Sequence, residues 1–121
     1  MRQLLETECP LVEFLFDLAA IPFDAAAITV APMADGGMGS LAIAPFATGR
    51  QLGSSPAQCH FFTDEGVPVS AVLNLDKDGL PFEIDVWRVD FKPVVAWPSR
   101  NDLVAGPPNN SLKRTDQSLR D

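Results

Sequence analysis

The sequence predicts an α+β domain: an N-terminal helix packed on a five-stranded antiparallel meander sheet, followed by a short C-terminal helix. Apolar residues first recur at helical spacing and then, from residue 27 to 91, alternate with polar ones. The joints between the alternating runs are short, and a parallel crossover needs about a dozen residues, so neighbouring strands are expected to be antiparallel. Proline makes up 11 of the 121 residues, which favours short elements because proline interrupts helices and central strands.

The helix is predicted in "ETECPLVEFLFDLAAIP", residues 6–22. Thr7 is a suitable N-cap, and Pro22 ends the helix because proline disfavours helical backbone in the residue before it. The apolar face that would cover the sheet comprises Leu11, Val12, Leu15 and Leu18, with Phe14 beside it.

Five strand-like runs follow the helix, at residues 27–33, 39–46, 58–63, 67–75 and 81–91. Turn sequences join them at Asp35-Gly36-Gly37, Asp64-Glu65-Gly66 and Asp76-Lys77-Asp78-Gly79. Residues 47–57 are interpreted as a longer polar loop. The stretch "WPSRNDLVAG" (97–106) predicts the short second helix, with Ser99 as N-cap, Asp102 in a capping box and Gly106 as its C-terminal stop.

The loop lengths predict how the strands pair. A three-residue loop at 64–66 predicts the pairs Phe61–Val69 and Cys59–Ala71. A four-residue loop at 76–79 predicts the pairs Leu75–Leu80, Leu73–Phe82, Ala71–Ile84 and Val69–Val86. A bulge near 87–88 would let Val89 and Phe91 join the buried face as well.

The opposite, polar face of the sheet carries the candidate site. His60, Ser70 and Asp85 form one cross-strand row, and Glu83 and Trp87 flank Asp85 on the last strand. The row is not a Ser-His-Asp triad, because the serine stands in the middle and Asp85 would lie about 10 Å from the histidine. A structural polar ladder and a binding patch are the remaining interpretations. The like charges of Glu83 and Asp85 beside Trp87 favour a contact surface for a cationic partner or a sister subunit.

Three other motifs contain residue types that occur in chemical sites. Adjacent strand residues such as Cys59 and His60 point to opposite faces, so they cannot form a thiolate–imidazole dyad unless a bulge intervenes. Residues 74–85 have the ligand spacing of an EF-hand loop, but their strand-like flanks favour a hairpin, which leaves only a weak surface calcium contact open. The stretch "DGGMGS" (35–40) precedes a strand and lacks lysine, which favours a turn over a phosphate loop, with Gly39 at a bulge or a close backbone approach. No cofactor, metal site or catalytic constellation is predicted.

The charge is distributed unevenly along the chain. Residues 1–106 hold six Lys/Arg and fourteen Asp/Glu, a net charge of −8, whereas residues 107–121 hold three Lys/Arg and two Asp, a net charge of +1. The acidic part would repel nucleic acid, and it suits either a basic protein partner or solubility alone. The first residues lack a signal-peptide pattern and no apolar run is long enough to span a membrane, so we expect a cytoplasmic protein with two free thiols, Cys9 and Cys59.

Two parts of the sequence carry resemblances. The stretch "NNSLKRT" (109–115) resembles the translated recombination site at the end of an integron gene cassette, which implies that 107–121 is a disordered read-through tail. A basic peptide that grips the acidic domain is the alternative for this tail. The phrases "DGGMGSL", "VSAVLNLDKDG", "FEIDVWRVDF" and "WPSR" resemble a bacterial family of unknown function. Because cassette-encoded proteins are often small homo-oligomers, the resemblance implies a homo-oligomer such as a dimer.

Together these observations predict one globular domain over residues 1–106 that acts by binding. The protein would be a small accessory protein carried on a mobile gene cassette, in a more specific form an immunity-like protein that neutralises a basic toxin. The alternative is a small-molecule-binding protein or an enzyme with a pocket on the polar sheet face, near His60, Glu83, Asp85 and Trp87.

Overall fold

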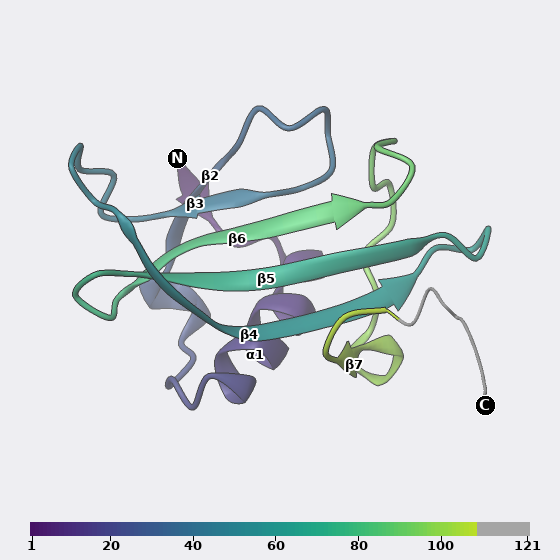
Figure 1. Ribbon diagram of the computed structural model, residues 1–121, viewed down its shortest axis with the longest axis horizontal. Helices are drawn as coiled ribbons and strands as arrows, with labels where there is room; N and C mark the ends of the chain where they lie inside the picture. Colours follow the sequence, from purple (N-terminus) through teal and green to yellow (C-terminus); the bar gives the residue numbers. More distant parts are fainter. Residues whose placement is uncertain (109–121) are drawn as a thin grey trace.

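The protein has an α+β fold with one N-terminal α-helix and a seven-stranded antiparallel sheet (Figure 1). This computed structural model describes residues 1–108. The predicted disordered tail therefore lies outside the described residues, apart from Pro107 and Pro108. Within residues 1–108, no helix has the length and apolar character needed to cross a membrane.

Eleven elements follow one another within residues 1–108. They are, in order, β1 (Arg2–Gln3), the 3-10 helix η1 (Glu6–Glu8), α1 (Cys9–Leu18), the 3-10 helix η2 (Ala25–Ala27), β2 (Thr29–Pro32), β3 (Leu41–Ile43), β4 (Leu52–Phe62), β5 (Pro68–Asp76), β6 (Pro81–Arg88), the 3-10 helix η3 (Arg100–Asp102) and β7 (Val104–Ala105).

The strand order is β1-β2-β3-β6-β5-β4-β7, so the predicted five-stranded meander is wrong in strand number and in order. The two additional strands, β1 and β7, span two residues each and are too short to show alternation in the sequence. The apolar strands β5 and β6 take central positions. Strand β4 is longer than predicted, because part of the expected polar loop is extended, and its Gly- and Pro-containing first half lies near the edge of the sheet.

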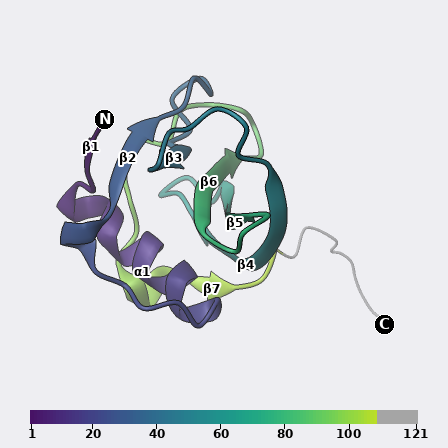
Figure 2. The same cartoon turned by 90° about the vertical axis from the view of Figure 1, so that its left-hand side faces the viewer.

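Helix α1 packs on the inner face of the sheet, which curls so that α1 lies between β2 and β7 (Figure 2). Its buried residues are Leu11, Val12, Leu15 and Phe16. Leu18, which was predicted to be buried, is exposed, because the helix ends there and the next turn passes through Ala20 at φ +58°. Thr7 lies inside η1 and does not cap α1; Glu8 holds that position and accepts hydrogen bonds from Arg2 at 2.8 and 3.0 Å.

The predicted register is confirmed in one hairpin and wrong in the next. Strands β4 and β5 pair as predicted, with Phe61 opposite Val69 and Cys59 opposite Ala71. Strands β5 and β6 are displaced by two residues, with the pairs Leu73–Ile84, Ala71–Val86 and Val69–Arg88. The bulge lies at Phe82, beside the turn, instead of near 87–88. A displacement of two keeps each side chain on its face, so the assignment of the faces survives.

The reason for this displacement is the side chain of Asp76 in the turn. It accepts hydrogen bonds from the backbone N–H groups of Asp78 (2.9 Å) and Leu80 (3.0 Å) and tightens the loop before the ladder resumes. At the other end of β6, Arg88 takes the buried position, and Phe91 is exposed instead of buried.

The predicted C-terminal helix over 97–106 is replaced by η3 and β7. The Ser99 hydroxyl donates to the Asp102 carboxylate (3.0 Å) and caps no backbone group, so no capping box forms. Leu103 is buried in the core, and β7 then pairs with Cys59 and His60 on β4. The burial of Leu103 and the pairing of β7 with β4 therefore favour this conformation over the short helix that the local sequence predicts.

Candidate functional site

The outer face of the sheet, opposite α1, carries all five predicted site residues. The cross-strand row consists of His60, Ser70 and Trp87, because the displaced register places Asp85 opposite Val72. The predicted row of His60, Ser70 and Asp85 is therefore wrong. His60 and Ser70 are buried, and His60 Nδ1 lies 2.8 Å from the carbonyl oxygen of Gly106. His60 thus anchors the chain after β7.

Glu83 and Asp85 face the same buried amide. Asn74 Nδ2 donates to Glu83 (3.1 Å) and to Asp85 (2.8 Å), while the Ser55 hydroxyl donates to Asn74 Oδ1 (2.7 Å). These contacts give the two adjacent carboxylates a structural role in the sheet. One buried amide thus binds both carboxylates on the same face of β6.

The apolar part of the outer face is an aromatic pair. Trp87 is 47% exposed and Phe91 is 69% exposed, and their ring centroids are 6.1 Å apart. Phe91 N–H donates to Arg88 C=O (2.8 Å), and Phe91 has φ +61°, in the left-handed region that a bulky residue rarely adopts. Sequence reasoning missed Phe91 because "VWRVDF" continues the alternation of a strand.

A second feature lies at the end of the sheet where β4 and β6 terminate. A cavity of about 410 Å³ opens there. None of the five predicted site residues lines it. Its walls come from the end of β4, the β4–β5 turn, Arg88, the segment 95–98 and η3, with the lining residues Phe61, Phe62, Thr63, Asp64, Glu65, Arg88, Val95, Ala96, Trp97, Pro98 and Asp102. We call this the sheet-end cavity.

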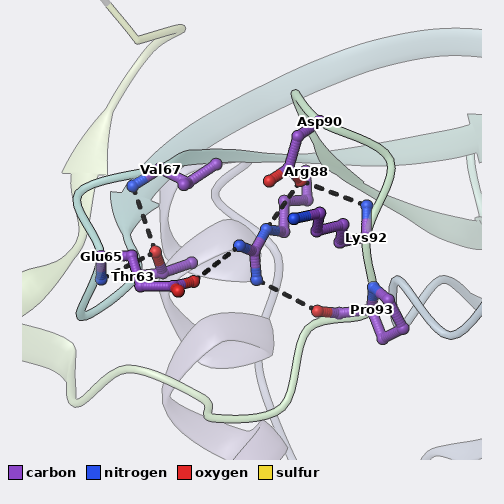
Figure 3. Close-up of polar contacts among 7 residues, drawn as sticks. All are labelled: Thr63, Glu65, Val67, Arg88, Asp90, Lys92 and Pro93. Carbon is purple, nitrogen blue, oxygen red and sulfur yellow. Dashed lines mark hydrogen bonds and ion pairs between the residues drawn. The ribbon is translucent and has the colours of Figure 1, made fainter.

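Arg88 organises one wall of the sheet-end cavity (Figure 3). Its side chain is 7% exposed and donates to Asp90 (2.8 Å), to the Pro93 carbonyl (3.2 Å) and to Glu65 (3.0 Å). Burial by itself would raise the pKa of Asp90, but hydrogen bonds from Lys92 N–H and Arg88 outweigh it and lower the pKa. The guanidinium thus ties the β4–β5 turn to the segment after β6.

The neighbouring walls are held by local contacts. The Thr63 hydroxyl accepts from the N–H groups of Glu65 (3.2 Å) and Val67 (3.1 Å), which sets the turn (Figure 3). Trp97 packs against Phe61, with centroids 6.4 Å apart, and lies on Gly39, where a Cβ would stand 2.3 Å from the indole ring. Gly39 is the close backbone approach that the sequence suggested, and the contact joins "DGGMGS" to "WPSR".

Geometry and burial determine which reactive groups these sites offer. Across the part of the chain that the structure describes, no group of three or more His, Cys, Asp or Glu side chains is arranged to hold a metal ion. Burial raises the pKa of the Cys59 thiol to about 12, so at neutral pH it is protonated and a poor nucleophile. The outer face presents Glu83 and Asp85, both bound by Asn74, on the same strand as Trp87. The sheet-end cavity presents exposed carboxylates together with the aromatic residues Phe61 and Trp97.

The chain belongs to the family described as a domain of unknown function (DUF6984), which matches residues 1–98. The match spans the helix, strands β1 to β6 and most of the residues that line the sheet-end cavity. Comparison with curated proteins and with solved structures found no match.

Proposed function

We propose that the protein acts by binding a basic partner on the outer face of the sheet, through Trp87 and Phe91 with Glu83 and Asp85 beside them. The single observation that carries the proposal is the exposed aromatic pair and the backbone conformation of Phe91. A left-handed conformation costs a non-glycine residue about 1 kcal/mol or more. Packing of the Phe91 side chain offsets little of this conformational cost, because most of its surface faces solvent. An exposed, strained aromatic side chain is typical of a contact residue.

The charge of the surrounding surface favours a cationic partner. Glu83 and Asp85 lie on the same strand face as Trp87, and residues 1–106 carry a net charge of −8. A homodimer formed through this face would bring two such carboxylate pairs together, which is unfavourable. Guanidinium groups pair with carboxylates and stack on indole rings, so an arginine-bearing partner satisfies both halves of the surface.

The proposal is tested with a labelled peptide of alternating arginine and glycine, followed by fluorescence anisotropy. The double variant Glu83→Gln with Asp85→Asn should weaken binding about fivefold or more without lowering the melting temperature, since each amide still offers an oxygen to Asn74. The matched control is Glu6→Gln with Asp78→Asn, which removes the same charge from two exposed positions elsewhere. Equal losses in both double variants would show that net charge alone attracts the peptide.

Phe91→Gly separates contact from folding at one position. Glycine relieves the left-handed strain but has more freedom in the unfolded chain, so stability should stay within about 1 kcal/mol of the parent or rise. Peptide affinity should fall. A clear loss of stability would show that Phe91 is a structural residue, and the outer face would then lose its strongest support.

The genetic setting that we propose is a mobile gene cassette, with the product acting in the cytoplasm as an accessory or immunity-like protein. The support is the sequence of residues 109–115 and the acidity of the preceding part. Sequencing the DNA downstream of the gene tests the first part, since a cassette requires the inverted half of the recombination site within or after the last codons. The product of a neighbouring gene, if basic, is the natural partner to test against the outer face.

A further inference from the structure

We infer that the sheet-end cavity binds a small organic cation, an ammonium or guanidinium group carried on an apolar body. The cavity shares no residue with the proposed outer contact, whose members are Glu83, Asp85, Trp87 and Phe91. The inference therefore goes beyond the proposed function and can fail or hold independently of it.

The size and the walls of the cavity suit an apolar body. Its volume of about 410 Å³ lies within the range of roughly 300–1,000 Å³ that is usual for small-molecule sites. Phe61 and Trp97 form an aromatic wall deep in the cavity, and Phe62 and Val95 expose apolar side chains at its rim. Exposed apolar groups around a hollow with an aromatic wall indicate surface that a ligand would cover.

The charges around the cavity select the sign of the ligand. Asp64, Glu65 and Asp102 are exposed at the rim, and Arg88 is the single cation among the lining residues. Arg88 does not attract an anion into the cavity, because Asp90 and Glu65 already compensate its charge. The net charge at the mouth is therefore negative. A cation held there also lies near aromatic side chains, which can attract it further.

The walls are held in place before a ligand arrives. The hydrogen bonds of Thr63 set the turn that carries Asp64 and Glu65, and Arg88 ties this turn to the carbonyl of Pro93. Trp97 is seated on Gly39, and Val94 N–H donates to the carbonyl of Gly37 (3.1 Å) on the same loop. A site of this kind loses little conformational entropy on binding.

The test uses two probes with the same aromatic body and opposite charges: 2-phenylethylammonium and 3-phenylpropionate. Binding is followed by NMR, with the indole N–H signal of Trp97 as the reporter and that of Trp87, on the outer face, as the internal control. The ammonium probe should shift the Trp97 signal saturably and leave the Trp87 signal in place. The carboxylate probe should bind about tenfold or more weakly.

The variant Asp64→Asn with Asp102→Asn should weaken binding of the ammonium probe about fivefold or more. The control variant Glu6→Gln with Asp78→Asn should leave it unchanged. Equal binding of both probes, preference for the carboxylate, or no saturable shift at Trp97 would each overturn the inference. A further outcome is that the arginine peptide still binds the Glu83/Asp85 variant but no longer binds the Asp64/Asp102 variant. In that case the basic partner docks at the sheet end, so the outer-face proposal fails while this site stands.

Discussion

The two ends of the β5–β6 hairpin each hold an arginine with a buried side chain bonded to a carboxylate. We call the end where the carboxylate is also buried the closed end, and the end where it is exposed the open end. The β5–β6 turn and the end of β6 lie at opposite ends of the sheet (Figure 1). The pair Arg50–Asp76 is beside the turn, and the pair Arg88–Glu65 is at the other end. The side chains of Arg50 and Asp76 are 9% and 5% exposed. Arg88 is buried to the same degree, but its partner Glu65 is 77% exposed.

At the closed end, every contact of the arginine is to the protein interior or its backbone. Arg50 donates to Asp76 (2.9 Å) and to the carbonyl oxygens of Ile43 (2.8 Å), Pro45 (2.7 Å) and Pro81 (2.7 Å). Its guanidinium also lies 5.1 Å from the ring centroid of Phe82, the bulged residue. One side chain thus joins the end of β3, the turn and the start of β6.

At the open end, the arginine borders the sheet-end cavity and one of its carboxylates reaches into solvent. The difference teaches that a buried ion pair does not by itself indicate a site. Where both partners are buried and the arginine also binds several backbone carbonyls, the pair organises the fold. Where the carboxylate is exposed beside an aromatic-lined hollow, its charge faces solvent and can contribute to recognition.

The largest effect that would test this contrast is the loss of either arginine. Arg50→Met removes four hydrogen bonds and leaves Asp76 buried without its cation, so the melting temperature should fall by about 10 °C or more. Arg88→Met should lower the melting temperature by about half as much, because water can hydrate Glu65 once the arginine is gone. Differential scanning calorimetry measures both. A larger fall for Arg88→Met would mean that the end we describe as open is the structural one.

The next effect concerns the wall of the sheet-end cavity. Gly39→Ala combines a left-handed backbone, φ +103°, with a Cβ 2.3 Å from the Trp97 ring, and should destabilise the protein by about 1–3 kcal/mol. Gly36→Ala is the matched control, since Gly36 also has a positive φ (+75°) but nothing within 4 Å of a Cβ. Denaturant unfolding of both variants separates the steric contact from the backbone strain. Equal losses of stability in the two variants would show that Trp97 does not pack on Gly39.

A smaller effect is the dependence of stability on pH. The backbone hydrogen bond from Leu80 lowers the pKa of Asp76; burial opposes the shift, and Arg50 adds to it. Because the folded-state pKa lies below the unfolded value of about 3.9, this stabilisation is present above that value and is lost as the pH falls through the folded pKa. Asp35 and Asp90 are shifted in the same direction. Between pH 6 and pH 2, the melting temperature should therefore fall less steeply for Asp76→Asn than for the parent.

The smallest effect is expected at the exposed carboxylate. Glu65→Gln keeps an acceptor for Arg88 and removes a charge that water already solvates, so the melting temperature should change by no more than about 2 °C. The same scan on Asp76→Asn gives the comparison between the two ends. If Glu65→Gln lowered the melting temperature as much as Asp76→Asn, the two ends would not differ, and the sheet-end site would lose this support.

The features that could be predicted from the sequence are those that depend on residues close together in the chain. The buried side of α1 follows from residues three and four apart, although its last turn was misplaced. The β4–β5 hairpin follows from a three-residue loop between alternating runs, and the period of two assigned each side chain to a face, even where the register was displaced. For this reason Glu83, Asp85 and Trp87 were correctly placed together on the outer face.

The strand order and the sheet-end cavity could not be predicted from the sequence, because both depend on contacts between residues far apart in the chain. Strand β6 reaches the side of β3 although β4 follows β3 in sequence, and local periodicity carries no information on which strand lies beside which. Trp97 meets Gly39, and Arg88 meets Glu65, across long separations. The helical signal of residues 97–106 was overridden in the same way, since the free edge of β4 and the core position of Leu103 offered those residues more contacts than a short helix could.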